Sequence, residues 1–301
     1  MKTEGLGENT EFSTFHPMVT LVYFVFVIGI TMFTMSPIFL GITLIMAWVY
    51  SVILKGKRGA KFNLVIIIPT IAMMTIINGL FTHNGETVLF YLDTNRITFE
   101  AIVYGFCAAI MLAAIIIWFS CFNIIMTSDK FIYLFGKIAP VLGLTLSMIF
   151  RFIPLLKNRF VEISNGQKCM GSNYSDGIIG KVRQFLKKLS ILISWSLESS
   201  IETADSMGAR GYGLKGRTSF HLFKFTRRDR YMFLFIILFG GLSLFGLAMG
   251  KATMYYYPKI VMGKVDIATI VTMISYSILL ISPIIIDITG EKKWRQLNLG
   301  M

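Results

Sequence analysis

Six apolar runs, each of about twenty residues, constrain what this chain can fold into. They cover 18–35, 37–54, 62–81, 99–126, 231–250 and 267–288. In a bilayer the backbone N–H and C=O groups find no water, so a run of this length is expected to form a helix that satisfies them internally. Hydrophobic residues make up 55% of the 301 residues, well above the share of a soluble protein. The sequence therefore predicts an all-α integral membrane protein with about six transmembrane helices.

The positions of Lys and Arg predict how these helices are oriented. The formal net charge is +13, and in a membrane protein such an excess usually marks cytoplasmic loops rather than a nucleic-acid surface. The loop 55–61 carries four cations, and 127–230 carries 17 Lys and Arg against 7 Asp and Glu. The loop 82–98 has two acidic residues against one basic residue, as expected of an outer loop. Both termini are therefore predicted to be cytoplasmic.

The edges of the basic stretch divide the chain into three regions. An N-terminal membrane region with four transmembrane helices is predicted over 1–126, a cytoplasmic region over 127–230, and a C-terminal membrane region with two transmembrane helices over 231–301. The middle region is not expected to be a separate soluble domain, because its helices are strongly apolar along one side. Long amphipathic helices of this kind lie along a membrane surface or pack against partner helices.

Two such helices can be located from the spacing of apolar residues. From Leu142 to Ile163 these residues recur in steps of three and four, which predicts a long helix with one apolar seam. Arg151 makes this helix amphipathic, and Pro154 is expected to bend it because proline removes a backbone hydrogen bond. A second amphipathic helix is predicted roughly from Lys181 to Met207.

The second long helix is predicted to end in a charged tip. Glu198, Glu202 and Asp205 recur at helical spacing and form an acidic stripe near its end. Gly211 is expected to take the left-handed backbone that closes a helix, and Arg210 suits the negative end of the helix dipole. The pattern therefore predicts a cation presented at a capped helix tip. An ordinary basic residue at an exposed helix end is the alternative.

The acidic stripe is expected to need a counterpart, because three like charges on one helix face repel each other. Arg159, Lys157 and Lys181 of the long helices are the candidates to pair with it. A solvated cytoplasmic face is the alternative, since exposed ion pairs contribute little to stability.

Four blocks of sequence, taken in order, carry a resemblance to a known family. They are the four N-terminal apolar runs, RFIPLL at 151–156, SIETADSMGARGYG at 200–213 and RRDRYMFLF at 227–235. This order resembles the transmembrane T component of energy-coupling-factor (ECF) transporters, a family that includes Q-like components of cobalt and nickel transport. These are bacterial vitamin and metal uptake systems of the ATP-binding-cassette superfamily. The Ala-Arg-Gly tripeptide alone is a weak signal, and its place between the other blocks makes the combination specific.

The resemblance implies a non-catalytic membrane scaffold in the bacterial cell membrane. Its implied partners are two ATP-binding-cassette ATPases and a membrane-embedded, substrate-binding S component, with ATP bound by the ATPases and no cofactor on this chain. The motif arginine of the family is taken to enter a groove on an ATPase, which assigns that role to Arg210, with Ala209 and Gly211 as small neighbours. Arg151, Pro154 and the acidic stripe are expected to support the long helices, which are then coupling helices. The choice of vitamin or metal is expected to lie in the S component.

The chain departs from the family pattern at one position. The family has a second Ala-Arg-Gly-like tripeptide after the RFIPLL helix, and the matching residues here are Cys169, Met170 and Gly171. Lys168 cannot replace the missing arginine, because two residues along a helix turn the side chain by about 200°. We predict that one ATPase is held there through apolar contact with Met170, which leaves Arg210 as the dominant polar anchor.

Other functions fit the residues less well. The stretch Gly211–Thr218 nearly matches a phosphate-binding loop, but it follows a helix rather than a strand. The histidines (His16, His83, His221) and the cysteines (Cys107, Cys121, Cys169) are scattered, so neither a metal site nor a catalytic dyad is expected. A self-contained multi-pass secondary transporter is the alternative function. Such a transporter usually carries charges inside its spans, and the apolar runs here contain few.

Overall fold

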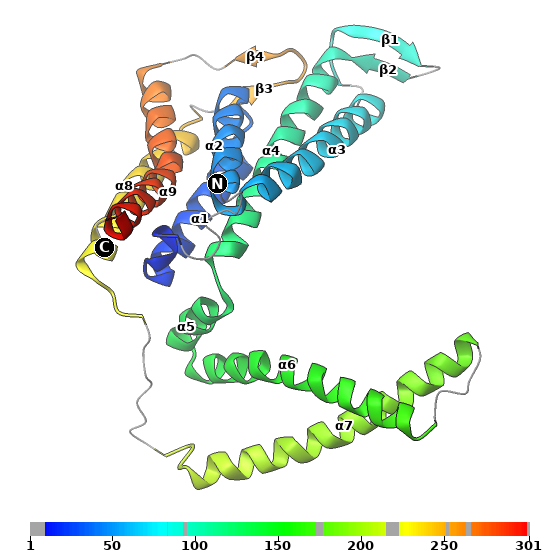
Figure 1. Cartoon of the computed structure of the whole chain (residues 1–301). Helices are drawn as coiled ribbons and strands as arrows, with labels where there is room; N and C mark the ends of the chain where they lie inside the picture. The colour runs from blue at the N-terminus through cyan, green and yellow to red at the C-terminus, as the bar shows by residue number, and fades with distance from the viewer. Residues whose placement is uncertain are drawn as a thin grey trace. The chain divides into compact units, whose positions relative to one another are not determined.

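The computed structural model describes residues 10–82, 84–92, 95–171, 177–214, 223–250, 253–262 and 266–299 (Figure 1). The chain divides into two compact units. Unit 1 comprises Met1–Thr127 and Phe223–Met301, and unit 2 comprises Ser128–Leu222. Unit 1 therefore brings together helices from both ends of the sequence.

Unit 1 is a bundle of long helices preceded by one short 3-10 helix. The elements are η1 (Phe12–Thr14), α1 (Pro17–Phe33), α2 (Pro37–Lys55), α3 (Lys57–Phe81), α4 (Phe99–Ile125), α8 (Arg227–Ala248) and α9 (Ile267–Leu299). Pro17 and Pro37 stand in the first turns of α1 and α2, where the missing N–H costs nothing. Gly56 has a φ of +62° and forms the whole connection between α2 and α3. Its lack of a Cβ permits this backbone, so the hairpin turns sharply.

Within the described residues, six helices are long and apolar enough to cross a membrane, which confirms the predicted fold class. They are Pro37–Lys55, Lys57–Phe81, Phe99–Ile125, Val141–Cys169, Arg227–Ala248 and Ile267–Lys293. The predicted span over 18–35 is not among them, because it forms α1 with only 17 residues. At about 1.5 Å per residue, a helix of this length falls slightly short of a hydrocarbon core of roughly 30 Å. The helix over 141–169 is among them because its first half is nearly free of charge.

The short helix α1 still reaches from one end of unit 1 to the other. His16, just before α1, donates its backbone N–H to Asp229 in the first turn of α8. Met35, just after α1, accepts a hydrogen bond of 2.6 Å from the hydroxyl of Tyr256, in the connection between α8 and α9. Residues flanking α1 therefore supply the length that the helix lacks. The inward side chains of α1 are buried in the core of unit 1: Val19, Tyr23, Phe24, Val27 and Ile30.

Polar side chains tie the helices of this bundle together. The Tyr276 hydroxyl of α9 shares hydrogen bonds with Thr31 of α1 at 2.9 Å and with Thr43 of α2 at 3.0 Å. Ser51 of α2 donates to the side-chain oxygen of Asn63 in α3 at 3.0 Å. Such bonds between membrane helices contribute about 1 kcal/mol each. These bonds determine which helices pack against each other. Apolar contact alone does not, because lipid and side chains are equally apolar.

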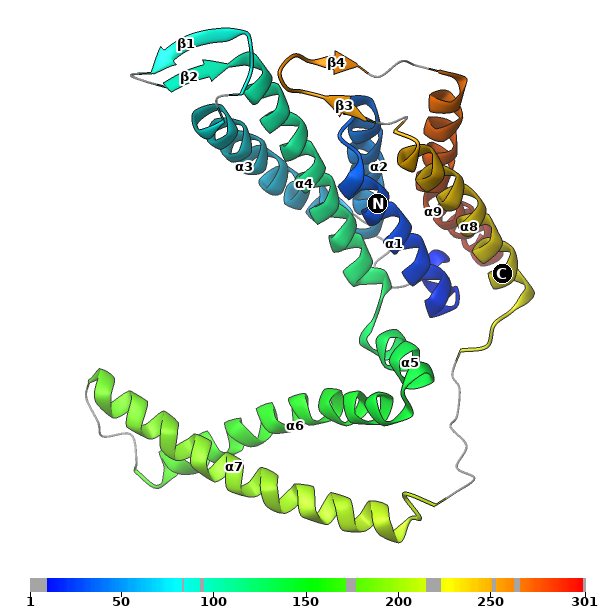
Figure 2. The ribbon, with the colours of Figure 1, turned by 180° about the vertical axis from the view of Figure 1, so that it is seen from behind.

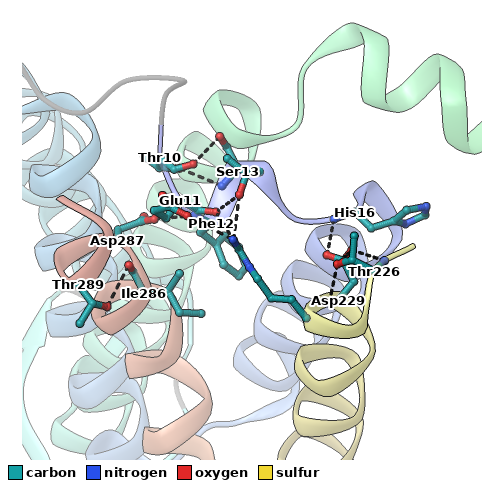
Figure 3. Close-up of polar contacts among 12 residues, drawn as sticks. Thr10, Glu11, Phe12, Ser13, His16, Thr226, Asp229, Ile286, Asp287 and Thr289 are labelled. Atoms are coloured by element: carbon teal, nitrogen blue, oxygen red, sulfur yellow. Dashed lines mark hydrogen bonds and ion pairs between the residues drawn. The ribbon is translucent and has the colours of Figure 1, made fainter. Parts of the chain in front are cut away.

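Residues 10–16, which we call the N-terminal clasp, are tied to α9 by one buried carboxylate (Figure 3). Asp287 of α9 is 1% exposed. Its Oδ1 accepts the backbone N–H of Phe12 at 2.7 Å, and its Oδ2 accepts the hydroxyl of Tyr50 at 3.1 Å. The Phe12 ring is fully buried and meets the ring of Tyr23 edge to face. Asp287 therefore joins the clasp, α2 and α9 at a single point.

A second carboxylate ties the clasp to the start of α8 (Figure 3). Asp229 accepts the His16 backbone N–H at 3.0 Å, and it forms a capping box with Thr226. In that box the Thr226 hydroxyl accepts from the Asp229 N–H, and the Asp229 carboxylate accepts from the Thr226 N–H at 2.8 Å. The guanidinium of Arg228 lies 4.0 Å from the centre of the Phe15 ring and donates to Thr14. The clasp thus fixes the point where the chain re-enters unit 1.

Two β-hairpins close the opposite end of unit 1. They are formed by β1 (Val88–Leu92) with β2 (Asn95–Thr98), and by β3 (Met254–Tyr255) with β4 (Val261–Met262). Both pairs are antiparallel, and Tyr91 lies opposite Arg96 in the first. An ion pair of 2.7 Å between Glu86 and Lys259 joins the two connections, and the hydrogen bond that the Lys259 ammonium donates to the Glu86 carboxylate raises the pKa of Lys259. We call this end the hairpin end and the other the clasp end.

The helices of unit 1 alternate in direction between these ends. The start of α1, the start of α8 and the last turns of α9 meet at the clasp end. Lys55 at the end of α2 contacts Ser120 near the end of α4, and Tyr50 of α2 bonds to Asp287, so these ends lie there as well. Because α4 ends and α8 begins at the clasp end, both connections to unit 2 leave from that end.

Unit 2 contains the long helices predicted from periodicity. Its elements are α5 (Ser128–Ile138), α6 (Pro140–Cys169) and α7 (Ile178–Ala209). Gly143 packs against Gly136 where α5 turns into α6, so closely that a Cβ on Gly143 would clash with the backbone of Gly136. Pro154 lies inside α6 without ending it. With 30 and 32 residues, α6 and α7 confirm the two predicted helices and extend both.

Replacing Asp287 with Leu should destabilise unit 1. The change leaves the Phe12 N–H and the Tyr50 hydroxyl buried without an acceptor, at a cost of about 1–3 kcal/mol for each group. Asp287→Asn keeps one acceptor oxygen and should lose less. Thermal unfolding in detergent, followed by tryptophan fluorescence, measures the effect. Asn123→Leu, on an exposed position of α4, is the control; equal midpoints for all variants would contradict the role of the carboxylate.

Candidate functional site

The long helices α6 and α7 of unit 2 cross each other (Figure 2). At the crossing the rings of Phe160 and Phe185 lie 6.1 Å apart, and the Lys188 ammonium donates to the Ser164 hydroxyl at 2.9 Å. Nearby, the guanidinium of Arg159 lies 4.9 Å from the centre of the Trp195 ring. These contacts join the last third of α6 to the N-terminal and middle parts of α7, and the last turns of α7 extend beyond the crossing.

The C-terminal end of α7 is closed by a Schellman motif at the predicted position. Arg210 is the C-cap, and Gly211 follows with a φ of +81°. The N–H of Tyr212 donates to Met207 C=O at 3.0 Å, and the N–H of Gly211 donates to Gly208 C=O at 3.0 Å. This is the paired bonding pattern of the motif, and the left-handed backbone at its centre suits glycine. The predicted helix end is confirmed, and we call Ala209–Gly211 the α7 tip.

The C-terminal end of α6 has the same backbone, with methionine in the place of arginine. Met170 is the C-cap with φ −80° and ψ 10°, against φ −82° and ψ 7° at Arg210. Gly171 follows with a φ of +75°, and its N–H donates to Lys168 C=O at 3.1 Å. We call Cys169–Gly171 the α6 tip. Met170 therefore stands at the structural counterpart of Arg210, as the alignment of tripeptides predicted.

The central side chain of each tip is exposed. Met170 is 73% exposed, and Arg210 is exposed as well. Cys169 and Ala209 beside them are exposed, while Gly211 is half-buried. Among the described residues, the side chains of Met170 and Arg210 make no hydrogen bond, ion pair or ring contact. A guanidinium and a thioether at these positions are thus available to a partner.

The residues expected to support the long helices are exposed along them. Arg151 and Pro154 lie on the exposed side of α6, and the acidic stripe is exposed along the last turns of α7. The expectation that Arg159 pairs with this stripe is wrong, because Arg159 pairs with Glu162 of its own helix at 2.6 Å. Within the ranges that the structure describes, the stripe meets no cation, so its charges face solvent.

The other candidate sites do not assemble in the described residues. His16 accepts the backbone N–H of Met18 at 3.2 Å through its Nδ1 and so caps α1. No group of three or more His, Cys, Asp or Glu side chains that could hold a metal ion occurs in the described part. His83, His221 and the second half of the phosphate-loop candidate, 215–218, lie outside the described residues.

Sequence reasoning missed the two carboxylates that organise the clasp end. In the sequence, Asp287 is only one of the few charges within the apolar runs, and Asp229 lies just before the fifth run. The role of Asp229 at the start of α8 could have been predicted, because Thr226 and Asp229 have the spacing of a capping box directly before an apolar run. No sequence signal indicates the partners of Asp287, since its two hydrogen-bond donors lie 275 and 237 residues away in sequence.

The fold and the two tips define the class: a multi-pass α-helical membrane protein with a pair of long helices that end in exposed, glycine-capped tips. The family described as cobalt transport protein (CbiQ) matches residues 12–221, more than half of the chain. The chain belongs to this family. The match covers η1 through α7 and includes both tips.

Curated relatives carry the name energy-coupling factor transporter transmembrane protein EcfT. The protein from Lactococcus lactis subsp. cremoris is 28% identical over 215 residues, covering 66% of this chain and 80% of that protein. The protein from Streptococcus thermophilus is 36% identical over 104 residues, covering 34% of this chain and 39% of the relative. The protein from Lactobacillus helveticus is 31% identical over 105 residues, covering 34% and 38%. The chain thus aligns with less than half the length of the last two.

Gly211→Ala should loosen the α7 tip, because a left-handed backbone costs a residue with a Cβ about 1–2 kcal/mol. Hydrogen exchange of the peptide over 197–214 should speed up by about tenfold at the Tyr212 amide, which the motif protects. Gly208→Ala is the matched control: its added Cβ meets nothing within 4 Å, and alanine stabilises a helix interior by roughly 0.5–1 kcal/mol. The two substitutions should therefore shift exchange in opposite directions. The same shift for both would contradict the cap assignment.

Proposed function

We propose that this chain is the transmembrane T component of an ECF-type transporter for a vitamin or a metal. In this role it is a non-catalytic scaffold that couples ATP hydrolysis by two ATP-binding-cassette ATPases to movement of a membrane-embedded S component. The names of its relatives and its family membership support the transport class. The ATP is bound by the ATPases, and the S component binds the substrate.

The observation that carries this proposal is the exposed guanidinium at the α7 tip. Arg210 sits on a rigid helix end whose backbone is fixed by two hydrogen bonds, so its direction is set before it meets a partner. A guanidinium offers five donors in a planar fork that fits a carboxylate with two parallel bonds. The small side chains on either side let the partner's backbone approach closely. We assign Arg210 to a carboxylate-lined groove on one ATPase.

The two long helices supply the mechanical connection. Their crossing at Phe160 and Phe185 makes α6 and α7 move as a pair, because displacing either tip strains the contacts at the crossing. The faces between crossing and tip are apolar and exposed, with Leu197 and Ile201 at 63% and 64%. Exposed apolar stripes of this kind mark interaction surfaces. In the proposed complex the S component and the membrane surface cover them.

The clasp end of unit 1 faces the cytoplasm in this proposal. The basic residues Lys57, Arg58 and Lys61 lie in the first turns of α3, which start at that end. Excess Lys and Arg mark the cytoplasmic side of membrane proteins. The start of α1 and the last turns of α9 also lie there, which supports a cytoplasmic location for both termini in a bacterial cell. The same end leads into unit 2, where the ATPases bind.

Arg210→Glu should release one ATPase from the complex. The reversed charge repels the carboxylates of the groove and lies at the negative end of the α7 dipole. The measurement is the ratio of ATPase to tagged chain after co-purification of the full complex, together with ATP-driven uptake in vesicles. Arg183→Glu, also exposed on α7 but far from the tip, is the matched control and should keep both ATPases. Two retained ATPases and normal uptake in Arg210→Glu would refute the assignment.

Cysteine labelling should place the two ends of unit 1 on opposite sides of the membrane. In a Cys169→Ser background, where Cys107 and Cys121 are buried, Asn84→Cys should react with an impermeant maleimide on intact cells. Lys57→Cys should react only after the cells are permeabilised, since it starts α3 at the clasp end. The reverse pattern would invert the proposed orientation.

A further inference from the structure

The two tips share one backbone and differ in chemistry, and this difference determines what each can bind. We propose that the α6 tip docks through Met170 into an uncharged, apolar socket on an ATP-binding-cassette subunit, and that this socket differs from the groove that receives Arg210. The inference rests on the proposed function, because it takes the α7 tip as an ATPase anchor. It adds the chemistry of the second contact.

The geometry of the tips makes the comparison direct. The backbone angles of Met170 and Arg210 agree within a few degrees, and each is followed by a left-handed glycine. Each N–H closes its helix in the same way, with Met170 donating to Gly166 at 3.1 Å and Arg210 donating to Ser206 at 3.2 Å. The side chain therefore leaves each helix end in the same direction relative to the helix. A partner that binds one tip would find the same backbone geometry at the other tip.

Charge then separates the two sockets. The C-terminal end of a helix carries a partial negative charge. At the α7 tip the guanidinium of Arg210 offsets this charge and can satisfy carboxylates on a partner. At the α6 tip the thioether of Met170 offers no charge, and Lys168 projects from a different side of the helix. A carboxylate enclosed against the α6 tip would face the negative helix end without a cation, which is a costly arrangement for a buried charge.

Apolar contact is what remains for Met170, and the side chain suits it. It is 73% exposed and makes no ring contact with a described side chain, so docking would remove most of its surface from water. Methionine is flexible and polarizable and makes favourable contacts with aromatic rings. An apolar socket with aromatic side chains therefore fits the α6 tip. A single groove chemistry cannot suit both tips, so the two ATPase grooves are unlike.

The test uses the full chain, tagged and co-purified with the two ATPase subunits of its complex. Each subunit is identified and counted by mass spectrometry, and its apparent affinity is followed by dilution. Met170→Leu keeps apolar volume and should bind within about twofold of the unchanged chain. Met170→Asp and Met170→Arg should each weaken one subunit by tenfold or more, because a charge enters an apolar socket. Arg210→Glu should release the other subunit.

Ionic strength gives a readout that a merely structural role would not move. The contact at Arg210 should weaken as salt rises, since screening acts on the ion pairs at its solvent-exposed rim, while the contact at Met170 should persist. Unchanged or tighter binding of Met170→Arg would overturn the inference, because it would reveal carboxylates in the socket. Release of the same subunit by Met170→Asp and Arg210→Glu would overturn it too.

Failure of this inference can be told from failure of the proposed function. If the unchanged chain binds no ATPase, the proposed function fails and the inference fails with it. If Arg210→Glu releases a subunit while every Met170 variant keeps both, only the apolar socket is refuted. Because Met170 is exposed and its backbone is capped by Gly171, these variants should fold normally, which circular dichroism checks.

Discussion

One buried carboxylate, that of Asp287, constrains unit 1 more than any other group. A carboxylate removed from water must be hydrogen-bonded, and the donors here are the Phe12 N–H and the Tyr50 hydroxyl. They come from the clasp and from α2, so one electrostatic requirement brings three distant segments together. Asp229 repeats the arrangement at the start of α8 through His16. The start of α8 is therefore held at a fixed point of unit 1.

Unit 2, in contrast, is not held together by a buried core of this kind in the residues that the structure describes. Its long helices bury little of their apolar surface within the described part of the chain, and they touch mainly around one crossing. The α7 tip at Arg210 lies 22 residues past Lys188 at the crossing, a length of about 33 Å, so a small rotation about the crossing moves this tip by several ångströms. Such helices gain stability from partners rather than from their own core. Under the proposed function, these exposed helices would carry movement between partner proteins.

The sequence predicted the elements better than their contacts. Hydrophobic period and length located the long helices, and the glycine rule located the end of α7, because both signals are local in sequence. The length of α1 was overestimated, since the apolar run continues past the helix into residues 34 and 35. The partners of Asp287 could not be predicted, because nothing near it in sequence indicates which distant donor it meets. A helix tip could be predicted because it depends only on its own helix. The clasp could not be predicted, because it depends on contacts between distant segments.

The two tips have the same backbone geometry but different side-chain chemistry. In each one glycine sets the backbone, and the cap residue before it is exposed, so its side chain contributes little to folding. A substitution at such a position leaves the backbone of the tip intact and changes only the side chain that a partner contacts. Arginine offers a fixed cation at the negative end of a helix, and methionine offers adaptable apolar surface. Two contacts with the same geometry can then differ in strength, salt dependence and choice of partner, although both act on the same pair of crossed helices.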